Sequence, residues 1–352
     1  MSAFTPGLAL AEAFYADVVA PLAEVPHAAC LLGEGSEVLG YDSVRSTDHE
    51  WGPRVQLLVA DGQVEGLRDR VERGLPPEYA GYPTAWYSLA HNKVTHHIEV
   101  TTFDEWIVER LGMDPRQGLD HADWLGLPQQ RLLQLTRGGV FRDDPGELTR
   151  VRRLLTWYPD DVWRWLLASQ WHLIGNTEPL LGRTLEAGDR RGARLIVARL
   201  CRLVMEMALL QERRYRPYDK WFGTAFAELD AAAVLGPLLD AAMEQPPGMD
   251  GALSRALVEL GHRHTALAIS EPVTPVLGDF QVGINDAVRP YPVLNAGDFV
   301  TGTTAAIADP ALRGLVAVGG IDQLTHADDA MVNFTSWPGL LTRAYRTQLG
   351  KN

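Results

Sequence analysis

Apolar residues recur at helical spacing between Gly7 and Val25, so an amphipathic helix is expected to open the chain. Short apolar runs bounded by turn-forming residues follow, and they predict three strands: HAACLLGEGS, RVQLLVA and VTHHIEVTT. The charged segment DGQVEGLRDRVERGL predicts a helix capped by Asp61. Strands and helices are therefore expected to alternate before the pattern changes near Pro128.

The pattern beyond Pro128 consists mainly of long helical periods, which continue to about Leu267. One of these helices is expected to begin after Pro159, with two aspartates in its first turn. A connection rich in proline and glycine and a helical tail from Gly297 complete the chain. We therefore expect an α+β fold with a mixed sheet flanked by helices, followed by a mostly helical part. The expected divisions are 1–127, 128–268 and 269–352.

Composition narrows the class of partner. The chain has 352 residues and a formal net charge of -13. Because a polynucleotide partner normally requires a basic surface, we do not expect one here. Cys30 and Cys201 lie in apolar patterns, where buried unpaired thiols are expected. No run approaches the length of a membrane span and no charged-then-apolar leader opens the chain, so we expect a cytoplasmic protein without a membrane partner. The pattern does not decide the oligomeric state.

The segment that follows the first predicted strand carries candidate chemistry. Gly35 permits a tight turn, and Ser36 offers a hydroxyl and an amide to a phosphate. Eleven residues separate Ser36 from Asp48, which is followed by His49 and Glu50. If this stretch is a strand, Asp48 and Glu50 share a face and repel each other unless a cation lies between them, and His49 faces away. The alternative interpretation is an exposed strand face.

The order Gly-Ser, then Asp-x-Glu, resembles the nucleotidyltransferase superfold related to polymerase beta. Many members carry an arginine where this chain has Leu39, so Arg45 is the substitute candidate for binding the nucleotide. The resemblance implies transfer of a nucleoside monophosphate from a nucleoside triphosphate, helped by two Mg²⁺ ions. It also implies that Gly35 and Ser36 contact the phosphates.

Oxygen donors match Mg²⁺, so Asp48 and Glu50 are the expected ligands. Glu99, on the third predicted strand, is the candidate for a third ligand or for the base that removes the acceptor proton. Asp104 and Glu105 lie near it in sequence and compete for that role.

Several long blocks narrow the resemblance further. They include GGVFRDDPGELTRVRRLLTWYPDDVWRWLLASQW, ERRYRPYDKWFGTAF and GGIDQLTHADDAM. These blocks resemble the bacterial domain of unknown function 4037 family, whose members more often have aspartate at the position of Glu50. The architecture is similar to that of aminoglycoside nucleotidyltransferases, whose active site lies in the cleft between domains. This likeness implies that Lys220 binds the triphosphate; a solvated lysine beside an aromatic ring is the alternative.

These features predict a metal-dependent nucleotidyltransferase that modifies a hydroxyl of a small molecule, such as an aminosugar or another natural product, and releases pyrophosphate. Two alternatives remain open. One is nucleotidylation of a protein or of a tRNA end, and the other is a non-catalytic regulator that binds nucleotide. The base and the acceptor are not fixed by the sequence.

Overall fold

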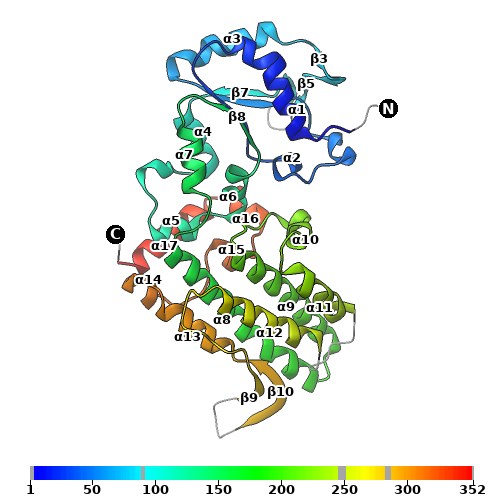
Figure 1. Cartoon of the computed structure of the whole chain (residues 1–352), viewed down its shortest axis with the longest axis vertical. Coiled ribbons are helices and arrows are strands. Elements are labelled where there is room, and N and C mark those ends of the chain that lie inside the picture. The colour runs from blue at the N-terminus through cyan, green and yellow to red at the C-terminus, as the bar shows by residue number, and fades with distance from the viewer. Residues whose placement is uncertain (1–3, 89–91, 245–250, 282–286, 351–352) are drawn as a thin grey trace. The chain divides into compact units, whose positions relative to one another are not determined.

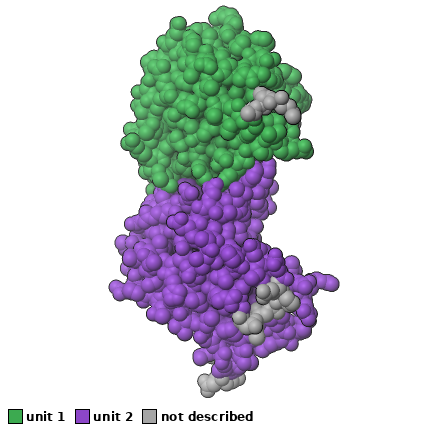
Figure 2. Space-filling view, turned by 45° about the vertical axis from the view of Figure 1, so that its right-hand side comes forward, with its two compact units in different colours: residues 1–119, 130–156 green, residues 120–129, 157–352 purple. Residues whose placement is uncertain are grey.

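The computed structural model describes residues 4–88, 92–244, 251–281 and 287–350. The chain divides into two compact units (Figure 2). The first unit comprises residues 1–119 and 130–156, and the second comprises 120–129 and 157–352. The division expected at 127/128 therefore falls within a region where the chain alternates between the units.

A mixed four-stranded sheet forms the centre of the first unit, in the order β7-β2-β1-β8 (Figure 1). Its strands are β1 (Ala28–Leu31), β2 (Val55–Leu58), β7 (Ile98–Thr101) and β8 (Gly139–Asp143). β2 and β7 run parallel, whereas β1 is antiparallel to both β2 and β8. The α+β class and the strands expected at β1, β2 and β7 are confirmed. β8 was not predicted, because it lies where the sequence pattern is mainly helical.

One face of this sheet is covered by the opening helical segment and by α3 (Val64–Gly74). Alternate strand residues such as Val55 and Leu57 point into this core, where Phe14 and Leu67 are fully buried. The opening segment is α1 (Gly7–Phe14), continued by a π-helix (Tyr15–Val19) and a 3₁₀ turn (Ala20–Leu22). The expected amphipathic helix is therefore confirmed.

Local details differ from the sequence prediction at Asp61 and in the third predicted strand. Asp61 begins a 3₁₀ turn (Asp61–Gln63), and no side-chain capping bond is made there, so its expected role as cap is wrong. The third predicted strand is split into two strands, β6 (Lys93–His96) and β7. β6 pairs with β5 (Ala85–Ser88). The remaining strands of this unit are β3 (Glu78–Tyr79) and β4 (Tyr82–Pro83).

Helices make up most of the second unit. α8 (Asp160–Glu186) packs against α9 (Arg190–Gln211) and α13 (Ala296–Ala305), and α12 (Ala252–Ala266) packs against α9 and α11. The expected helix after Pro159 is confirmed as α8. The helical pattern over 219–243 forms two helices, α10 (Asp219–Ala227) and α11 (Ala232–Glu244).

A hairpin of β9 (Leu277–Gln281) and β10 (Val288–Leu294) extends from these helices (Figure 1). The sequence predicted only a connection here, because its prolines and glycines disfavour a regular strand. The pairing register shifts between Arg289 and Pro292, which shows how the ladder accommodates a proline.

The remaining helices of the described residues belong to both units. They are α2 (Ser36–Leu39), α4 (Phe103–Leu111), α5 (His121–Gly126), α6 (Gln129–Thr136), α7 (Glu147–Leu154), α14 (Pro310–Gly314), α15 (Ile321–Thr325), α16 (Asp329–Asn333) and α17 (Trp337–Gln348), with 3₁₀ turns at Val44–Asp48 and Pro115–Gln117. Both cysteines are buried and unpaired, as expected. In the described ranges, no helix is long and apolar enough to cross a membrane.

Candidate functional site

The loop that follows β1 holds the predicted Gly-Ser turn. Gly35 has φ 129°, a backbone conformation that residues with a side chain rarely adopt. A Cβ at this position would collide with the guanidinium of Arg54 and the carboxylate of Glu37, which form an ion pair. Glu37 is buried, and Ser36 is half-buried at the first position of α2. Glycine is therefore required here by conformation and by space.

Three arginines approach this loop, and none of them was predicted from the sequence. Arg54 Nη2 donates a hydrogen bond of 2.6 Å to the carbonyl oxygen of Glu34. A Cβ built at Gly33 would lie 4.0 Å from Nη1 of Arg110. The half-buried guanidinium of Arg131 interacts electrostatically with Glu34, and its pKa is lowered by burial. The only sequence signal for Arg54 is its place as the first residue of the predicted strand RVQLLVA.

Asp48 and Glu50 do not lie on a strand, so that expectation is wrong. Asp48 is the last residue of a 3₁₀ turn. A reciprocal pair of hydrogen bonds between Ser43 and Ser46 caps the N-terminal end of this turn. Glu50 follows with φ 46°, in the left-handed region, so the alternation of side chains along a strand does not apply.

His49 also differs from its prediction, because it contacts Asp48 instead of facing away. His49 Nδ1 lies 2.6 Å from Asp48 Oδ1, and Arg45 Nε lies 3.7 Å from Asp48 Oδ2. The hydrogen bond from His49 lowers the pKa of Asp48, and the positive charge of Arg45 also favours its carboxylate form. The Arg45 side chain is 92% exposed, so its contact with Asp48 lies in solvent. Its predicted role in nucleotide binding stays a prediction.

Glu50 approaches a stacked pair of rings. Its Oε2 lies 3.9 Å from Nδ1 of His97, whose ring stacks on Trp86 with 3.9 Å between centroids and 5° between planes. Burial lowers the pKa of His97, which disfavours a charged imidazole at neutral pH. The stack thereby fixes the position of His97 next to Glu50.

Glu99 belongs to a row of residues across the sheet. It pairs with Gln56 on β2, which in turn pairs with Cys30 on β1. Gln56 accepts from the amide of Leu32 at 3.0 Å and donates to its carbonyl at 2.9 Å, so the end of β1 is tied to β2. Glu99 Oε2 accepts a hydrogen bond of 2.7 Å from Arg110 Nη2. The expected position of Glu99 on the strand adjacent to β2 is therefore confirmed.

The predicted metal ligands have suitable oxygen donors, but their geometry does not fit a metal centre. Asp48 contacts His49 and Arg45, and Glu99 contacts Arg110. Over the described ranges, no three His, Cys, Asp or Glu side chains are grouped so that they could hold one metal ion. Formation of a metal site from Asp48, Glu50 and Glu99 would therefore require these carboxylates to rearrange.

Several predicted residues nevertheless occupy one end of the sheet. β1 ends at Leu31 directly before the glycine loop, and β2 and β7 begin at this same end. The segment with Asp48 and Glu50 precedes β2, and His97 directly precedes β7. The structure thus collects the loop, Glu50 and Glu99 in one region of the first unit.

Lys220 lies in the second unit, near the N-terminus of α10. Its Nζ lies 4.9 Å from the centre of the Trp221 ring, a cation–π contact. Its predicted role in binding the triphosphate stays a prediction.

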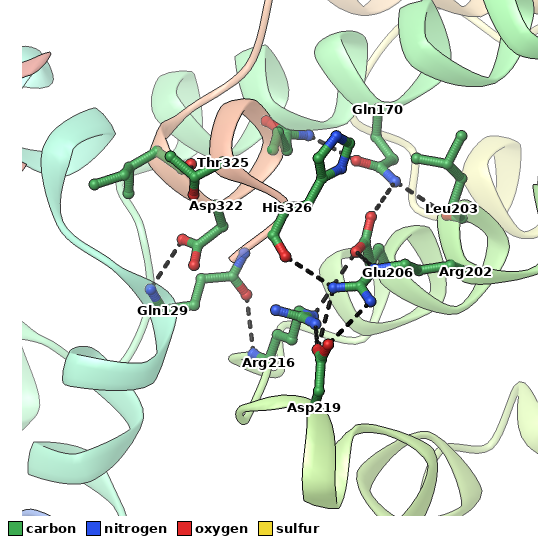
Figure 3. Close-up of polar contacts among 12 residues, drawn as sticks. Gln129, Gln170, Arg202, Leu203, Glu206, Arg216, Asp219, Asp322, Thr325 and His326 are labelled. Carbon is green, nitrogen blue, oxygen red and sulfur yellow. Dashed lines mark hydrogen bonds and ion pairs between the residues drawn. The ribbon is translucent and has the colours of Figure 1, made fainter. Parts of the chain in front are cut away.

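Next to Lys220 in sequence, Asp219 belongs to a network of charged side chains (Figure 3). Arg202 approaches Asp219 with two nitrogens, at 3.1 and 3.2 Å, and also lies 3.1 Å from Glu206. Arg216 forms an ion pair with Asp219, and its side chain is only 3% exposed. These contacts connect α9 with the beginning of α10, so the network orders that part of the second unit.

Asp322 lies beside this network and is half-buried (Figure 3). It accepts a hydrogen bond of 2.9 Å from the amide of Gln129, and the Gln129 side chain accepts from the amide of Arg216 at 2.9 Å. Burial raises the pKa of Asp322 to about 6. Gln129 therefore bridges the α15 region and the segment before α10.

Comparison with known proteins gives one match. The model of the family described as "Domain of unknown function (DUF4037)" matches residues 124–222, and this match supports the predicted family. The matched range contains α8, α9 and most of the charged network. No curated protein and no solved structure matches the chain.

Proposed function

We propose that the protein is a nucleotidyltransferase that transfers a nucleoside monophosphate from a nucleoside triphosphate to a hydroxyl of a small molecule. The observation that carries this proposal is the convergence of the glycine loop, Arg54, Arg110 and Glu99 at one end of the sheet. Arg54 and Arg110 are the proposed contacts for an anion such as a triphosphate, which would compete with Glu37 and Glu99 for these guanidinium groups.

Each residue has a proposed role. The absence of a side chain at Gly35 lets Arg54 approach the loop, and the Ser36 hydroxyl donates to the phosphate oxygens. Arg110 neutralises the phosphate charge. Glu99 accepts the proton of the acceptor hydroxyl, a role worth about 10²–10⁴-fold in rate.

Asp48 and Glu50 are the proposed ligands for Mg²⁺ after they have rearranged, and Mg²⁺ would supply charge stabilisation at the phosphate oxygens. A triphosphate that attracts Arg110 would free the carboxylate of Glu99.

The direct test measures pyrophosphate release with each of the four nucleoside triphosphates, Mg²⁺ and a panel of aminosugar acceptors. We expect turnover with at least one pairing and a loss of about 100-fold or more in Glu99→Gln. Asp69→Asn is the matched control, because Asp69 is exposed on α3 away from the loop, and we expect it to keep full activity. Absence of pyrophosphate release with every pairing would count against transfer.

The ion pairs of Asp48 and Glu99 favour a second candidate, a regulator that binds nucleotide without consuming it. Titration calorimetry with ATP separates the two functions. Saturable binding without turnover supports the regulator, and binding that is unchanged in Arg54→Gln and Arg110→Gln contradicts both.

A further inference from the structure

We propose that a pocket of the first unit, separate from the glycine loop, binds a small organic polyamine. The pocket has a volume of about 510 Å³, within the range of small-molecule sites. Leu58 and Val59, at the carboxyl end of β2, and Thr102 and Phe103, just after β7, contribute to its wall. Ligands of open α/β sheets commonly bind at the carboxyl ends of parallel strands, and β2 and β7 are the parallel pair here.

The charge of the lining selects a cation. Among the described residues that line the pocket, five are acidic and none is basic: Asp61, Asp104, Glu105, Asp143 and Glu147. We call this site the acidic pocket. Its carboxylates come from four segments, namely a 3₁₀ turn, α4, β8 and α7, so they are distributed around the lining.

The surrounding positive charge offsets these carboxylates only in part. Arg116 contacts Asp104 and lies 3.0 Å from Glu147, and Arg150 lies 3.6 Å from Glu147. The N-termini of α4 and α7 each contribute roughly half a positive charge. Two guanidinium groups and two helix ends amount to about three positive charges against five negative ones, so the pocket remains negative.

The positions of the carboxylates are also held by the fold. Asp143 accepts from the amides of Gly146 at 3.0 Å and Thr149 at 2.8 Å, and Glu105 accepts from the Thr101 hydroxyl at 2.9 Å. A ligand therefore meets acceptors that are already oriented, which lowers the entropy cost of binding.

The apolar part of the wall favours a ligand whose cationic groups are joined by apolar spacers. Ala28, Leu58 and Leu148 are buried residues that also line the pocket. A linear polyamine matches this pattern, since its ammonium groups can contact separate carboxylates while its methylene spacers contact the apolar wall.

The acidic pocket is separate from the candidate nucleotide site. Ala28 begins β1, whereas the glycine loop follows the end of β1, so the two sites lie at opposite ends of that strand. The inference consequently does not depend on the proposed function.

The test is titration calorimetry of the full chain with spermidine at near-physiological salt. We expect saturable binding in the wild type, and affinity at least about tenfold weaker in the double variant Asp61→Asn/Glu105→Gln. Asp69→Asn removes one charge from α3 outside the pocket and is expected to bind as the wild type does. Fully acetylated spermidine, which lacks the charges, is expected to bind weakly.

Thermal unfolding of each variant separates loss of the site from loss of the fold. If the double variant unfolds early, Asp61→Asn alone provides the test, because Asp61 is exposed and makes no capping bond. Absence of saturable binding in the wild type, or equal weakening in Asp69→Asn, would overturn the inference.

Discussion

Arg110 on α4 and Glu99 on β7 form an ion pair in which Nη2 lies 2.7 Å from Oε2. Their side chains are 28% and 30% exposed, so solvent screens the pair only in part. This contact places a cation beside the carboxylate that the sequence singled out. It also makes Glu99 a residue whose role depends on the state of Arg110.

Removal of either partner should therefore destabilise the first unit. We expect Arg110→Gln to lower the free energy of unfolding by about 1–3 kcal/mol, because a partly buried carboxylate loses its donor. Glu99→Gln should cost less, and the double variant should cost less than the sum of the single variants. Urea denaturation of all three measures the coupling. If the two single costs add up to the cost of the double variant within about 0.3 kcal/mol, the ion pair contributes nothing to stability. Arg73→Gln, an exposed change on α3, is the control.

Gly35→Ala should disrupt the loop after β1. A Cβ there would collide with Arg54 and Glu37, and φ 129° is unfavourable for alanine, so we expect a loss of about 1–3 kcal/mol. Gly62→Ala is the matched control, because a Cβ there has no neighbour within 4 Å among the described residues. Thermal and urea unfolding provide the measurement. Equal stability of the two variants would contradict the strained geometry.

Glu178 on α8 should make stability depend on pH. It is buried, its carboxyl accepts from the amide of Leu294 at 2.9 Å, and burial raises its pKa to about 8. Because the pKa in the folded state lies above the unfolded value of 4.5, its stabilising contribution is complete below pH 4.5 and declines as the pH rises to 8.

The expected decline amounts to up to about 4 kcal/mol, and Glu178→Gln should remove it from the pH profile. Urea denaturation between these pH values tests this prediction. Glu186→Gln, an exposed change on the same helix, should leave the wild-type slope unchanged. A wild-type slope that persists in Glu178→Gln would assign the pH dependence to another group.

In the charged network of the second unit, substitution of Arg216 should lower the free energy of unfolding more than substitution of Asp219. Arg216 is almost fully buried, so Arg216→Met leaves Glu206 with less compensation and should cost about 3–5 kcal/mol. Asp219 is 66% exposed, and Asp219→Asn keeps one acceptor oxygen, so its cost should stay below about 1 kcal/mol. Chemical denaturation compares the two variants. Similar costs would show that burial does not control this network.

Sequence periodicity alone predicted the opening helix, β1, β2, β7 and the long helix α8, together with the burial of both cysteines. These features follow from local patterns, since an amphipathic period or a short apolar run specifies which face must leave water. Glu99 was placed correctly for the same reason, because it lies within a clearly alternating strand. The Gly-Ser turn was also readable, since glycine at a positive φ is a local requirement.

Tertiary structure decided the rest. β8 and the β9–β10 hairpin depend on pairing between backbones, which leaves only a weak signal in strands interrupted by proline and glycine. The 3₁₀ turn at Asp48 overrides the alternation expected there, and the approach of Arg54 and Arg110 to one loop joins segments distant in sequence. Such contacts are set by packing across the sheet, and packing is not encoded in the spacing of any single segment.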